Sequence, residues 1–582
     1  MSSLKKLKDA TSLRQVASLL EVKLGMMSFL LYKKPKTALY KKFDIPKRYG
    51  GTREILAPER DLKLLQHRLS NILQECLGEI NAVHGHVEDE KHQGIAHGFK
   101  RYHTIMTNGR PHVAHRYVFN VDLHDFFGSI NFGRVRGFFL KDKNFNLHTD
   151  VATVIAQIAC HENKIPQGSP CSPVISNLIG HSLDIQLVRL ACRAGATYTR
   201  YADDLTFSTN KRSFPSRIAI QTSEHEWEPG SGLKRIVARS GFYFNDKKTR
   251  MQYRDSRQEV TGLTVNRKVN VPATYRYTVR AMVDSLFKTG EFDFIYKKPD
   301  GKGGVVVNKS KGERKQLLGM LSYIDQVDLF NRKLHADNGL EPIETNGRIA
   351  LFRCFLYFDF FYAPDVPIIV CEGKTDNVYL KCAIKSLVTS YPSLAAPGKP
   401  PKLKVRFFKY ADRRTSKITE LTGGVGGICK LLKHYHEDVI TKFKAPAPKH
   451  PVIVLIDNDN GANNIYEAIA GITKKPKSKG FADFIHITCN LYVVPTPLGP
   501  LKAQTSIEDF FDATTLATPL NGKTFNRNKE IDDSTHYGKT AFALNVVAKN
   551  AGTINFDKFK PILERVVKVI DDYEARRKAT VK

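Results

Sequence analysis

Three aspartates in the N-terminal half of the chain have the chemistry of a metal-dependent phosphoryl-transfer site. Asp203 and Asp204 are adjacent within the acidic run 201–204. Adjacent carboxylates repel each other unless a cation lies between them, and a divalent metal ion is the usual cation. A third acid, Asp122, ends the apolar segment 117–121. Three carboxylates that hold two Mg²⁺ ions suit nucleotidyl transfer, because one ion activates the attacking hydroxyl and the other neutralises the leaving pyrophosphate.

A second set of acids follows two apolar runs in the C-terminal half. Glu372 follows the run 367–371, and Asp457 and Asp459 follow the run 451–456. Continuous apolar runs that alternate with helical segments are typical of a parallel α/β sheet. Ligands of such sheets bind at the carboxyl ends of the strands, which is where these acids fall. The alternative is a Rossmann-like domain whose acids are ordinary surface residues.

Short strands and a loop are expected to position the first three acids. The β-prone residues around the acidic pair predict a hairpin over 199–208 with the acids at its tight turn. The segment 117–121 predicts a buried strand. Between them, the loop 165–173 is rich in Pro and Gly and should lead into a helix, with Ser172 as N-cap and Pro173 at the first helical position.

The order and spacing of these motifs resemble the palm of reverse transcriptases. The residues that carry the resemblance are Asp122, Gln167-Gly168-Ser169-Pro170 and Tyr201-Ala202-Asp203-Asp204. The resemblance implies an α+β right-hand polymerase with fingers, palm and thumb. It also implies that the three aspartates are catalytic and hold two Mg²⁺ ions, and that the substrates are dNTPs.

Four further residues are candidates for nucleotide binding. The segment 43–58 predicts two strands around a Gly-Gly turn and resembles the fingers hairpin, in which Arg53 would bind the triphosphate through its forked donors. By resemblance, Phe127 would stack under the sugar and exclude a 2′-hydroxyl, while Gln167 and Lys248 would lie near the nucleotide. The alternatives are a solvated basic turn for Arg53 and an ordinary core side chain for Phe127.

One segment after the palm narrows the family. The run Val260-Thr261-Gly262-Leu263-Thr264-Val265-Asn266 resembles a hallmark of retron reverse transcriptases. The resemblance implies that Val260, Thr261 and Gly262 bind RNA. It further implies a structured non-coding RNA as template and primer, and a branched RNA–DNA hybrid (msDNA) that stays bound as the product.

The C-terminal acids resemble those of the TOPRIM fold, which topoisomerases, bacterial primases and overcoming-lysogenization-type nucleases share. The resemblance implies that Asp457 and Asp459 hold one or two Mg²⁺ ions, with Glu372 as acid/base or further ligand. The segment 505–511 resembles an additional acidic motif of the nucleases and makes Glu508 a metal candidate. Retron reverse transcriptases fused to a C-terminal TOPRIM domain form a subgroup that this chain resembles along its length.

Composition and charge indicate the class of partner. The 582 residues include 90 Lys and Arg against 58 Asp and Glu, a formal net charge of +32. A polyanionic partner such as nucleic acid is expected, with a merely basic surface as the alternative. The 9 cysteines form no CxxC pair, which disfavours a zinc ribbon and a disulfide framework. No apolar stretch approaches the roughly 18 residues of a membrane span, so we expect a cytoplasmic protein without a membrane partner.

The motifs divide the chain into four expected domains. They are N-terminal helices and fingers (1–110), the palm (111–270), the thumb (271–362), and a TOPRIM domain with a C-terminal helical extension (363–582). The last of these is expected to be an α/β domain with a parallel sheet.

The leading hypothesis is a retron reverse transcriptase with a TOPRIM nuclease effector that the hybrid holds inactive, acting in anti-phage defence. The target of the nuclease, RNA such as tRNA or DNA, stays open, as does a homo-oligomeric state. One alternative is a TOPRIM domain that binds nucleic acid without cutting it, although clustered acids in so basic a chain disfavour a clamp. Others are a group II intron-like reverse transcriptase, a primase or a topoisomerase.

Overall fold

The computed structural model describes residues 2–46, 52–83, 95–299, 305–337, 346–410, 413–527, 532 and 534–581. The chain forms two compact units, each assembled from three segments. The first unit comprises Met1–Arg276, Tyr296–Asn308 and Gln326–Ile343; the second comprises Tyr277–Ile295, Lys309–Asp325 and Glu344–Lys582. The predicted thumb therefore contributes to both units, and the four-domain division stays a prediction.

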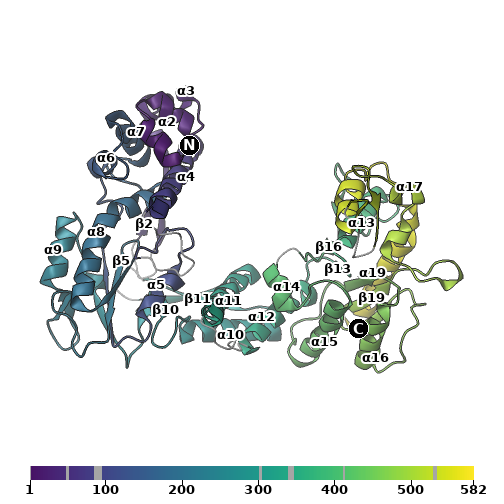
Figure 1. Ribbon diagram of the computed structural model, residues 1–582. Coiled ribbons are helices and arrows are strands. Elements are labelled where there is room, and N and C mark those ends of the chain that lie inside the picture. Colours follow the sequence, from purple (N-terminus) through teal and green to yellow (C-terminus); the bar gives the residue numbers. More distant parts are fainter. Residues whose placement is uncertain are drawn as a thin grey trace. The chain divides into compact units, whose positions relative to one another are not determined.

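The first half of the chain alternates helices with short strands (Figure 1). Its helices are α1 (Ser3–Asp9), α2 (Leu13–Leu19), α3 (Leu24–Ser28), α4 (Arg60–Val83), α5 (Ile105–Gly109), α6 (Phe132–Lys141), α7 (Thr149–Ala159), α8 (Ser172–Ala194), α9 (Ser231–Arg239) and α10 (Ala273–Thr289). Its strands are β1 (Tyr40–Pro46), β2 (Thr52–Pro58), β3 (Tyr117–Asp122), β4 (Thr197–Tyr201), β5 (Asp204–Thr209), β6 (Ala219–Gln221), β7 (Trp227–Pro229), β8 (Arg250–Tyr253), β9 (Glu259–Val260) and β10 (Leu263–Thr264).

The second half begins with a hairpin and continues as an α/β arrangement. Its helices are α11 (Arg314–Asp337), α12 (Asn346–Tyr357), α13 (Asp376–Ser386), α14 (Arg413–Thr419), α15 (Val425–Thr441), α16 (Ala462–Thr473), α17 (Ala513–Leu516), α18 (Lys539–Ala541) and α19 (Lys560–Val581). Its strands are β11 (Asp293–Pro299), β12 (Val305–Lys311), β13 (Ile368–Cys371), β14 (Ala395–Ala396), β15 (Lys402–Leu403), β16 (Arg406–Phe407), β17 (Val452–Ile456), β18 (Ile485–Thr488), β19 (Leu491–Pro495), β20 (Thr524–Phe525) and β21 (His536–Tyr537).

A four-stranded antiparallel sheet of order β4-β5-β3-β8 is the centre of the first unit. In its middle strand, β3, the side chains of Val118, Phe119 and Val121 are buried. These branched and aromatic residues favour a strand and fill the space between the sheet and the helices. The same hydrophobic core includes residues of α4, α6, α7 and α8. Both the buried strand and the acidic hairpin predicted from the sequence are confirmed.

The strands predicted over 43–58 are also present. β1 and β2 pair antiparallel, with Ile45 opposite Arg53, and their Gly50–Gly51 turn lies outside the described residues. α4 follows directly, and it packs into the core because its apolar residues recur every three or four positions. Those buried positions are Leu62, Leu65, Leu69, Leu73 and Cys76.

The predicted start of α8 is wrong by one residue. The helix begins at Ser172, its cap is Cys171, and no side chain caps it. The Ser172 hydroxyl instead donates to the carbonyl of Pro166 at 2.8 Å. A buried serine that serves the preceding loop cannot also cap the helix, so Pro173 occupies the second helical position.

The second unit contains a five-stranded sheet of order β16-β13-β17-β19-β18. Its first four strands are parallel, and β18 is antiparallel to β19. α13 and α19 pack on the sheet face that carries Ile369, Cys371 and Ile453. Figure 1 shows α15 and α16 on the opposite side of the sheet from α13. The prediction of a mainly parallel α/β sheet in this part of the chain is confirmed.

In the part of the chain that the structure describes, no single helix has the length and apolarity to cross a membrane. The bent pair Leu13–Leu19 and Leu24–Lys33 meets both criteria only when its two helices are taken together.

Candidate active sites

The first candidate site is a cluster of three aspartates at the end of the palm sheet. Pairing of β3 with β5 places Asp122 directly opposite Asp204. Asp203 lies in the turn between β4 and β5, and its carbonyl accepts a hydrogen bond from the amide of Leu123 at 3.0 Å. The sheet therefore gathers the three acids that the sequence separates by about 80 positions.

The three carboxylates repel one another at the end of the sheet, where Asp122 is buried, Asp203 is half-buried and Asp204 is exposed. Burial, followed by the charge of Asp122, raises the pKa of Asp203. Partial desolvation and the charges of both other aspartates raise the pKa of Asp204 to about 7. Lys248 opposes this repulsion, because its Nζ lies 2.7 Å from Oδ2 of Asp122. Lys248 and Arg250 thus offset only part of the repulsion, and the pKa of Asp204 stays raised.

Such a cluster fits divalent metal ions by the chemistry of its donors. Ionised carboxylates offer only acceptor oxygens, which are the ligands that Mg²⁺ prefers. A cation between them would also remove the repulsion that raises their pKa values. Among the described residues no three His, Cys, Asp or Glu side chains already meet in a metal-binding arrangement. The sequence prediction of metal ligands at Asp122, Asp203 and Asp204 therefore stays a prediction with a compatible donor set.

The acidic turn is supported from below by a buried ion pair. Arg200 is fully buried, and its guanidinium donates to both oxygens of Asp184, at 2.8 and 2.7 Å. The same guanidinium donates to the carbonyl of Ala202 at 3.1 Å. Ala202 has a φ of 56°, a left-handed conformation that costs a non-glycine residue about 1–2 kcal/mol. The ion pair therefore holds a strained turn in the shape that presents Asp203 beside Asp122.

Gly98 is needed at the same turn because the chain passes too close for a side chain. A Cβ atom at this position would lie 2.5 Å from the amide nitrogen of Ala202. The residues before it pair with β4, since the amide of His97 donates to the carbonyl of Arg200 at 2.8 Å. The turn is thus packed from two sides.

Two of the predicted nucleotide-binding residues lie on segments that touch each other. The carbonyl of Gln167 accepts a hydrogen bond from the amide of Leu56 in β2, the strand that carries Arg53. Gly168 has a φ of 118°, and a Cβ there would lie 2.6 Å from the Leu56 carbonyl oxygen. The loop before α8 is therefore fitted against the hairpin.

Phe127 is half-buried and takes part in an aromatic cluster rather than lying deep in the core. Its ring contacts the rings of Phe126 and Phe99 edge to face, with centroid distances of 5.6 and 6.0 Å. Such contacts fix the orientation of a ring whose remaining surface is open. Its predicted role toward the sugar stays a prediction.

The segment predicted to bind RNA forms a tight turn between β9 and β10. Val260 is fully buried against Val118 and Val265, so its side chain supports the turn from inside. Thr261 and Gly262 form the tip, with φ values of 47° and 79°. If this segment contacts RNA, the tip is the part that can do so.

The second candidate site lies at the carboxyl ends of β13 and β17. These strands are parallel neighbours, and the amide of Glu372 donates to the carbonyl of Leu455 at 3.0 Å. An oxygen of Asp457 accepts from the amide of Ile507 at 2.8 Å. This bond brings the segment with Glu508 onto the strand ends, as the order of the motifs predicts.

The electrostatics of this site resemble those of the first. Burial, then the charges of Asp376, Glu508 and Glu372, raise the pKa of Asp457 to about 8. Burial likewise raises the pKa values of Glu372 and Asp376. Lys539 is the nearby cation, with its Nζ 3.0 Å from Oε1 of the fully buried Glu508. The donor set again suits a divalent cation, which would relieve the repulsion.

Asp376 is a member of this cluster that the sequence analysis missed. It is nearly fully buried, and its carboxylate accepts from the amide of Gly373 at 2.7 Å. The signal was its position four residues after Glu372, at the first position of α13. A carboxylate in that place faces back toward the strand end, because side chains in the first turn point to the N-terminus of the helix.

Asp459 differs from the other acids of the cluster. It is exposed, and its Oδ1 accepts from the amides of Gly461 and Ala462, at the start of α16. Its charge contributes to the raised pKa of Glu372. Asp459 therefore lies on the Glu372 side of the site with one oxygen already engaged.

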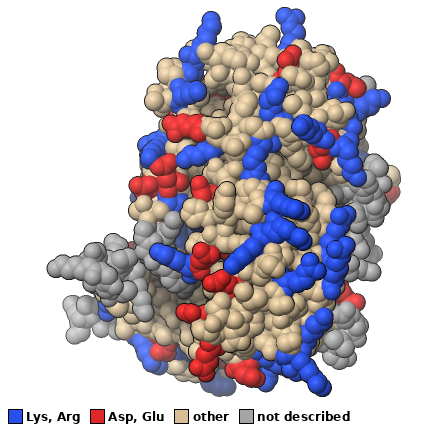
Figure 2. Space-filling model, turned by 90° about the vertical axis from the view of Figure 1, so that its left-hand side faces the viewer, with Lys and Arg blue, Asp and Glu red and all other residues tan. Residues whose placement is uncertain are grey.

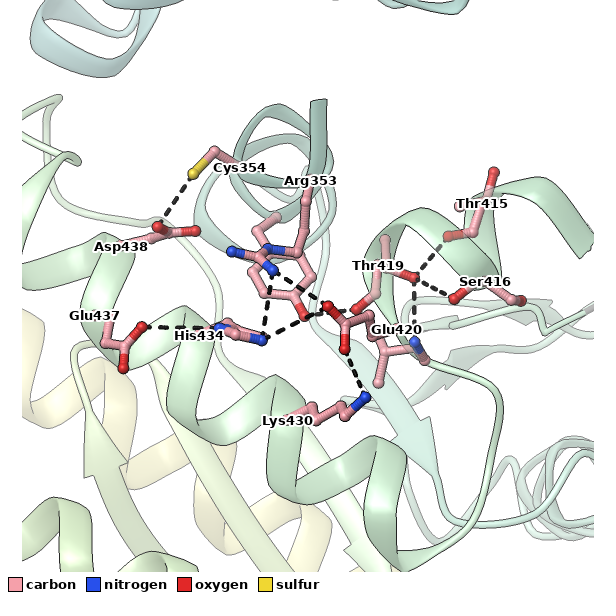
Figure 3. A network of polar contacts seen from close by, with 12 residues as sticks. Arg353, Cys354, Thr415, Ser416, Thr419, Glu420, Lys430, His434, Glu437 and Asp438 are labelled. Carbon is pink, nitrogen blue, oxygen red and sulfur yellow. Dashed lines mark hydrogen bonds and ion pairs between the residues drawn. The ribbon is translucent and has the colours of Figure 1, made fainter. Parts of the chain in front are cut away.

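Figure 3 shows the polar network beside the loop that leads from α14 to α15. Glu420 forms ion pairs with Lys430 at 2.6 Å and with Arg353 at 3.3 Å, and His434 lies 3.9 Å away. The hydrogen bond from Lys430 is the largest cause of the lowered pKa of Glu420. One carboxylate thus joins α12 to α15.

This network fixes the start of a glycine-rich loop at the second site. Gly423 and Gly424 follow shortly after Glu420 and have φ values of 91° and 79°, which favour glycine. The amide of Gly424 donates to the carbonyl of Glu372 at 2.9 Å. The loop therefore sets the backbone of a predicted catalytic residue.

Comparison with known sequences places the first site within a described family. The profile of the family described as reverse transcriptase (RNA-dependent DNA polymerase) matches residues 45–270. That range contains Asp122, Asp203 and Asp204 and ends before Glu372. It therefore covers the first acidic cluster and not the second.

The curated relatives bear the names of retron reverse transcriptases. The chain is 34% identical over 288 residues to Retron Mx65 reverse transcriptase of Myxococcus xanthus, covering 46% of this chain and 61% of that protein. It is 32% identical over 355 residues to Retron Mx162 reverse transcriptase of the same organism, covering 56% and 65%. It is 30% identical over 247 residues to Retron Ec86 reverse transcriptase of Escherichia coli, covering 42% and 68%. The chain thus spans about three fifths to two thirds of these relatives.

Solved structures give only weak likenesses. A telomerase from Candida albicans in complex with a telomeric RNA fragment is 9% identical, with a TM-score of 0.31, over 72% of this chain and 66% of that chain. An apo telomerase from Candida tropicalis is 14% identical, with a TM-score of 0.28, over 41% and 56%. At these scores the likenesses bear on neither fold nor function.

Proposed function

Because the chain belongs to the retron reverse transcriptases, we propose that its first unit is an RNA-directed DNA polymerase. The observation that carries the proposal is the convergence of Asp122, Asp203 and Asp204 within the residues matched to that family. The three carboxylates would hold Mg²⁺ ions. Bound there, the ions would lower the pKa of the primer hydroxyl and neutralise the leaving pyrophosphate.

The other residues of this site have separable roles in the proposed reaction. Lys248 would pass from Asp122 to a phosphate oxygen of the incoming nucleotide, since it is a flexible point charge. Arg53 on β2 would bind the triphosphate, next to the loop of Gln167. Phe127 would restrict the sugar to the deoxy form. The basic surface in Figure 2, where Lys and Arg predominate over Asp and Glu, favours a nucleic-acid template.

Primer extension tests this proposal directly. The purified chain, an oligo(dT) primer on poly(rA) and Mg²⁺ should give extended DNA. Asp203→Asn should lower the rate at least 100-fold, because it removes a charge that the proposed reaction needs. Asp255→Asn, which changes an exposed aspartate elsewhere in the same unit, is the matched control. Equal extension by both variants would reject the site.

We further propose that the template is a structured non-coding RNA and that the product is msDNA that stays bound. The family and the turn of the half-buried Thr261 and the exposed Gly262 support this part of the proposal. The test is the nucleic acid that co-purifies with the chain. A discrete species with a DNase-sensitive part should accompany the wild type and be absent from Asp203→Ala/Asp204→Ala. Heterogeneous RNA in both preparations would contradict it.

For the second unit we propose a metal-dependent nuclease of TOPRIM type. The cluster of Glu372, Asp376, Asp457 and Glu508 at the ends of parallel strands supports it, because ordinary surface acids have no reason to gather around two buried carboxylates, Asp376 and Glu508. The bound hybrid would hold this nuclease inactive in the cytoplasm. Release of the nuclease during phage infection would stop the growth of the host cell. RNA and DNA are both candidate targets.

Toxicity and cleavage in the same cells test the nuclease. Expression without the non-coding RNA should release the nuclease and arrest growth, and Asp457→Asn should abolish the arrest while leaving primer extension intact. Asp571→Asn, an exposed aspartate in α19, is the control. Growth arrest that Asp457→Asn leaves unchanged would reject the nuclease. Weaker nucleic-acid binding by Asp457→Asn, with no cleavage by the wild type or any variant, would make the second unit a binding module.

A further inference from the structure

Two loops of the second unit are anchored to Asn458, the residue between Asp457 and Asp459. The side-chain amide of Asn458 donates to the carbonyl of Gly480 at 2.9 Å. Its backbone pairs with that of Thr505 through hydrogen bonds of 2.9 and 3.2 Å. Both loops are therefore fixed to the strand end that carries the acidic cluster.

The first of these, the lysine loop (residues 474–481), is a dense run of positive charge. Lys474, Lys475 and Lys479 are exposed, while Lys477 pairs with Glu467 at 2.6 Å. Several ammonium groups on a loop that is pinned at its end favour a polyanion. They lie on the loop that Asn458 ties to the cluster.

The lysine loop ends in an aromatic side chain that stays open to solvent. The ring of Phe481 is 55% exposed, and the Nζ of Lys502 lies 4.9 Å from the ring centroid. Lys502 belongs to the second loop, the proline loop (residues 497–505). The two loops thus together present a flat apolar ring with a positive charge beside it.

The proline loop adds a second apolar group to this surface. Leu501 is completely exposed, and both Leu501 and Lys502 have left-handed backbones, with φ values of 55° and 62°. Each such residue costs about 1–2 kcal/mol, so the loop is held in this shape by its surroundings. A hydrogen bond of 2.8 Å from the amide of Gly499 to the carbonyl of Ala503 closes it. Strain that keeps a leucine in water points to a contact made there.

We propose that the lysine loop and the proline loop bind single-stranded nucleic acid next to the second acidic cluster, with Phe481 stacking on an unpaired base. The proposal rests on the nuclease function above and assigns its substrate class. Aromatic stacking together with lysine–phosphate contacts is the general mode of single-strand binding. A duplex offers no base face on which Phe481 could stack, because its bases are already stacked on one another. Lys479 and Lys502 would contact the flanking phosphates.

The single tryptophan of the chain makes a local reporter feasible. The sequence contains 1 Trp, Trp227 in β7, so Phe481→Trp in a Trp227→Phe background puts one fluorophore at the proposed stacking position. A 12-nucleotide unstructured oligonucleotide should quench the fluorescence saturably. The same sequence as a duplex should need at least 10-fold higher concentration. Absence of quenching, while anisotropy shows the oligonucleotide bound elsewhere on the chain, would overturn the proposal.

Charge variants in the same background test the phosphate contacts. Lys479→Gln should weaken the quenching and lower the slope of log affinity against log salt by about 0.7, the value for one phosphate contact on a single strand. Leu544→Ala, which trims an exposed leucine elsewhere in the same unit, should change neither quantity. Quenching by duplex and single strand with equal affinity would also overturn the stacking.

The fluorescence does not depend on cleavage, so this inference and the nuclease can fail separately. Quenching without cleavage would support the single-strand binding site and reject the proposed nuclease activity. Cleavage without quenching would support the nuclease activity and reject the binding site at Phe481. When both hold, Phe481→Ala should raise the KM for single-stranded substrate about 10-fold and leave primer extension unchanged.

Discussion

At the scale of single residues, the turn that carries Asp203 in the proposed polymerase site depends on a buried pair of charges beside it. Arg200 and Asp184 are both buried, and the guanidinium also holds the carbonyl of Ala202 in the acidic turn. Tyr198 donates its hydroxyl to the same Asp184 at 2.9 Å. A buried pair of this kind contributes less to net stability than to holding one arrangement, but losing one partner strands a charge in the interior.

We therefore expect Asp184→Ala to destabilise the chain by about 3–5 kcal/mol, because Arg200 would remain buried without its counter-ion. Thermal or urea unfolding measures the loss. Glu228→Ala, which breaks an exposed ion pair of 3.0 Å with Lys234, should cost at most about 1 kcal/mol. Equal losses in the two variants would contradict the structural role of the buried pair.

The sequence predicted the site residues best where reactive residue types occur in a recognisable order along the chain. The acids Asp122, Asp203 and Asp204 could be predicted because their spacing follows a motif and one strand pairing joins them. Arg200 and Asp184 could not be identified, since nothing in a sequence shows that an arginine on a strand lies beneath a helix residue 16 positions away. The pair is a property of tertiary packing.

At the scale of secondary-structure elements, a buried histidine joins the two strands of the acidic hairpin. His112 follows α5 and is fully buried. Its Nε2 lies 2.8 Å from the hydroxyl of Thr199 in β4, and its Nδ1 lies 2.7 Å from that of Ser208 in β5. Burial, with smaller effects from His115 and His97, lowers the pKa of His112 to about 3. The native hairpin therefore requires the neutral ring.

This predicts that His112 makes the chain less stable as the pH falls. Its pKa is about 6.5 when unfolded and about 3 when folded, so the unfolded state takes up the proton first. Its contribution to the free energy of unfolding should be complete above pH 6.5 and should fall by about 1.4 kcal/mol for each pH unit below that value. The loss should therefore reach about 2 kcal/mol at pH 5. Urea unfolding at pH 7 and pH 5 measures this difference.

His112→Gln should show a smaller loss of stability between those two pH values, because the variant has no ring to protonate. His225→Gln, at an exposed position, should match the wild type. If His112→Gln and the wild type lose the same free energy, the buried ring does not control this pH dependence.

Elements were predictable to different degrees for physical reasons. The hairpins and the parallel sheet follow from local patterns of apolar residues, and they are present. The cap of α8 was missed because the Ser172 hydroxyl has a competing acceptor in the preceding loop, the carbonyl of Pro166. Asp376 was missed because it belongs to a helix start rather than to a strand end.

At the scale of the whole molecule, the two compact units have separate hydrophobic cores. Phe119 is fully buried in the core around the palm sheet, and Ile453 is fully buried in the core of the parallel sheet. The division of the segment 277–343 between the units means that a cut in the sequence at one boundary would damage both. Unfolding of the intact chain is therefore the appropriate measure of their independence.

We expect two calorimetric transitions, because chains with more than one core unfold core by core. Phe119→Ala should lower the melting temperature of one transition and Ile453→Ala that of the other, each by the temperature equivalent of about 3–5 kcal/mol for the cavity it leaves. Primer extension should be lost on heating in step with the transition that Phe119→Ala moves. The nuclease activity should instead be lost in step with the transition that Ile453→Ala moves. A single transition that both variants shift equally would mean that the two cores unfold as one, and neither proposed activity could then be lost without the other.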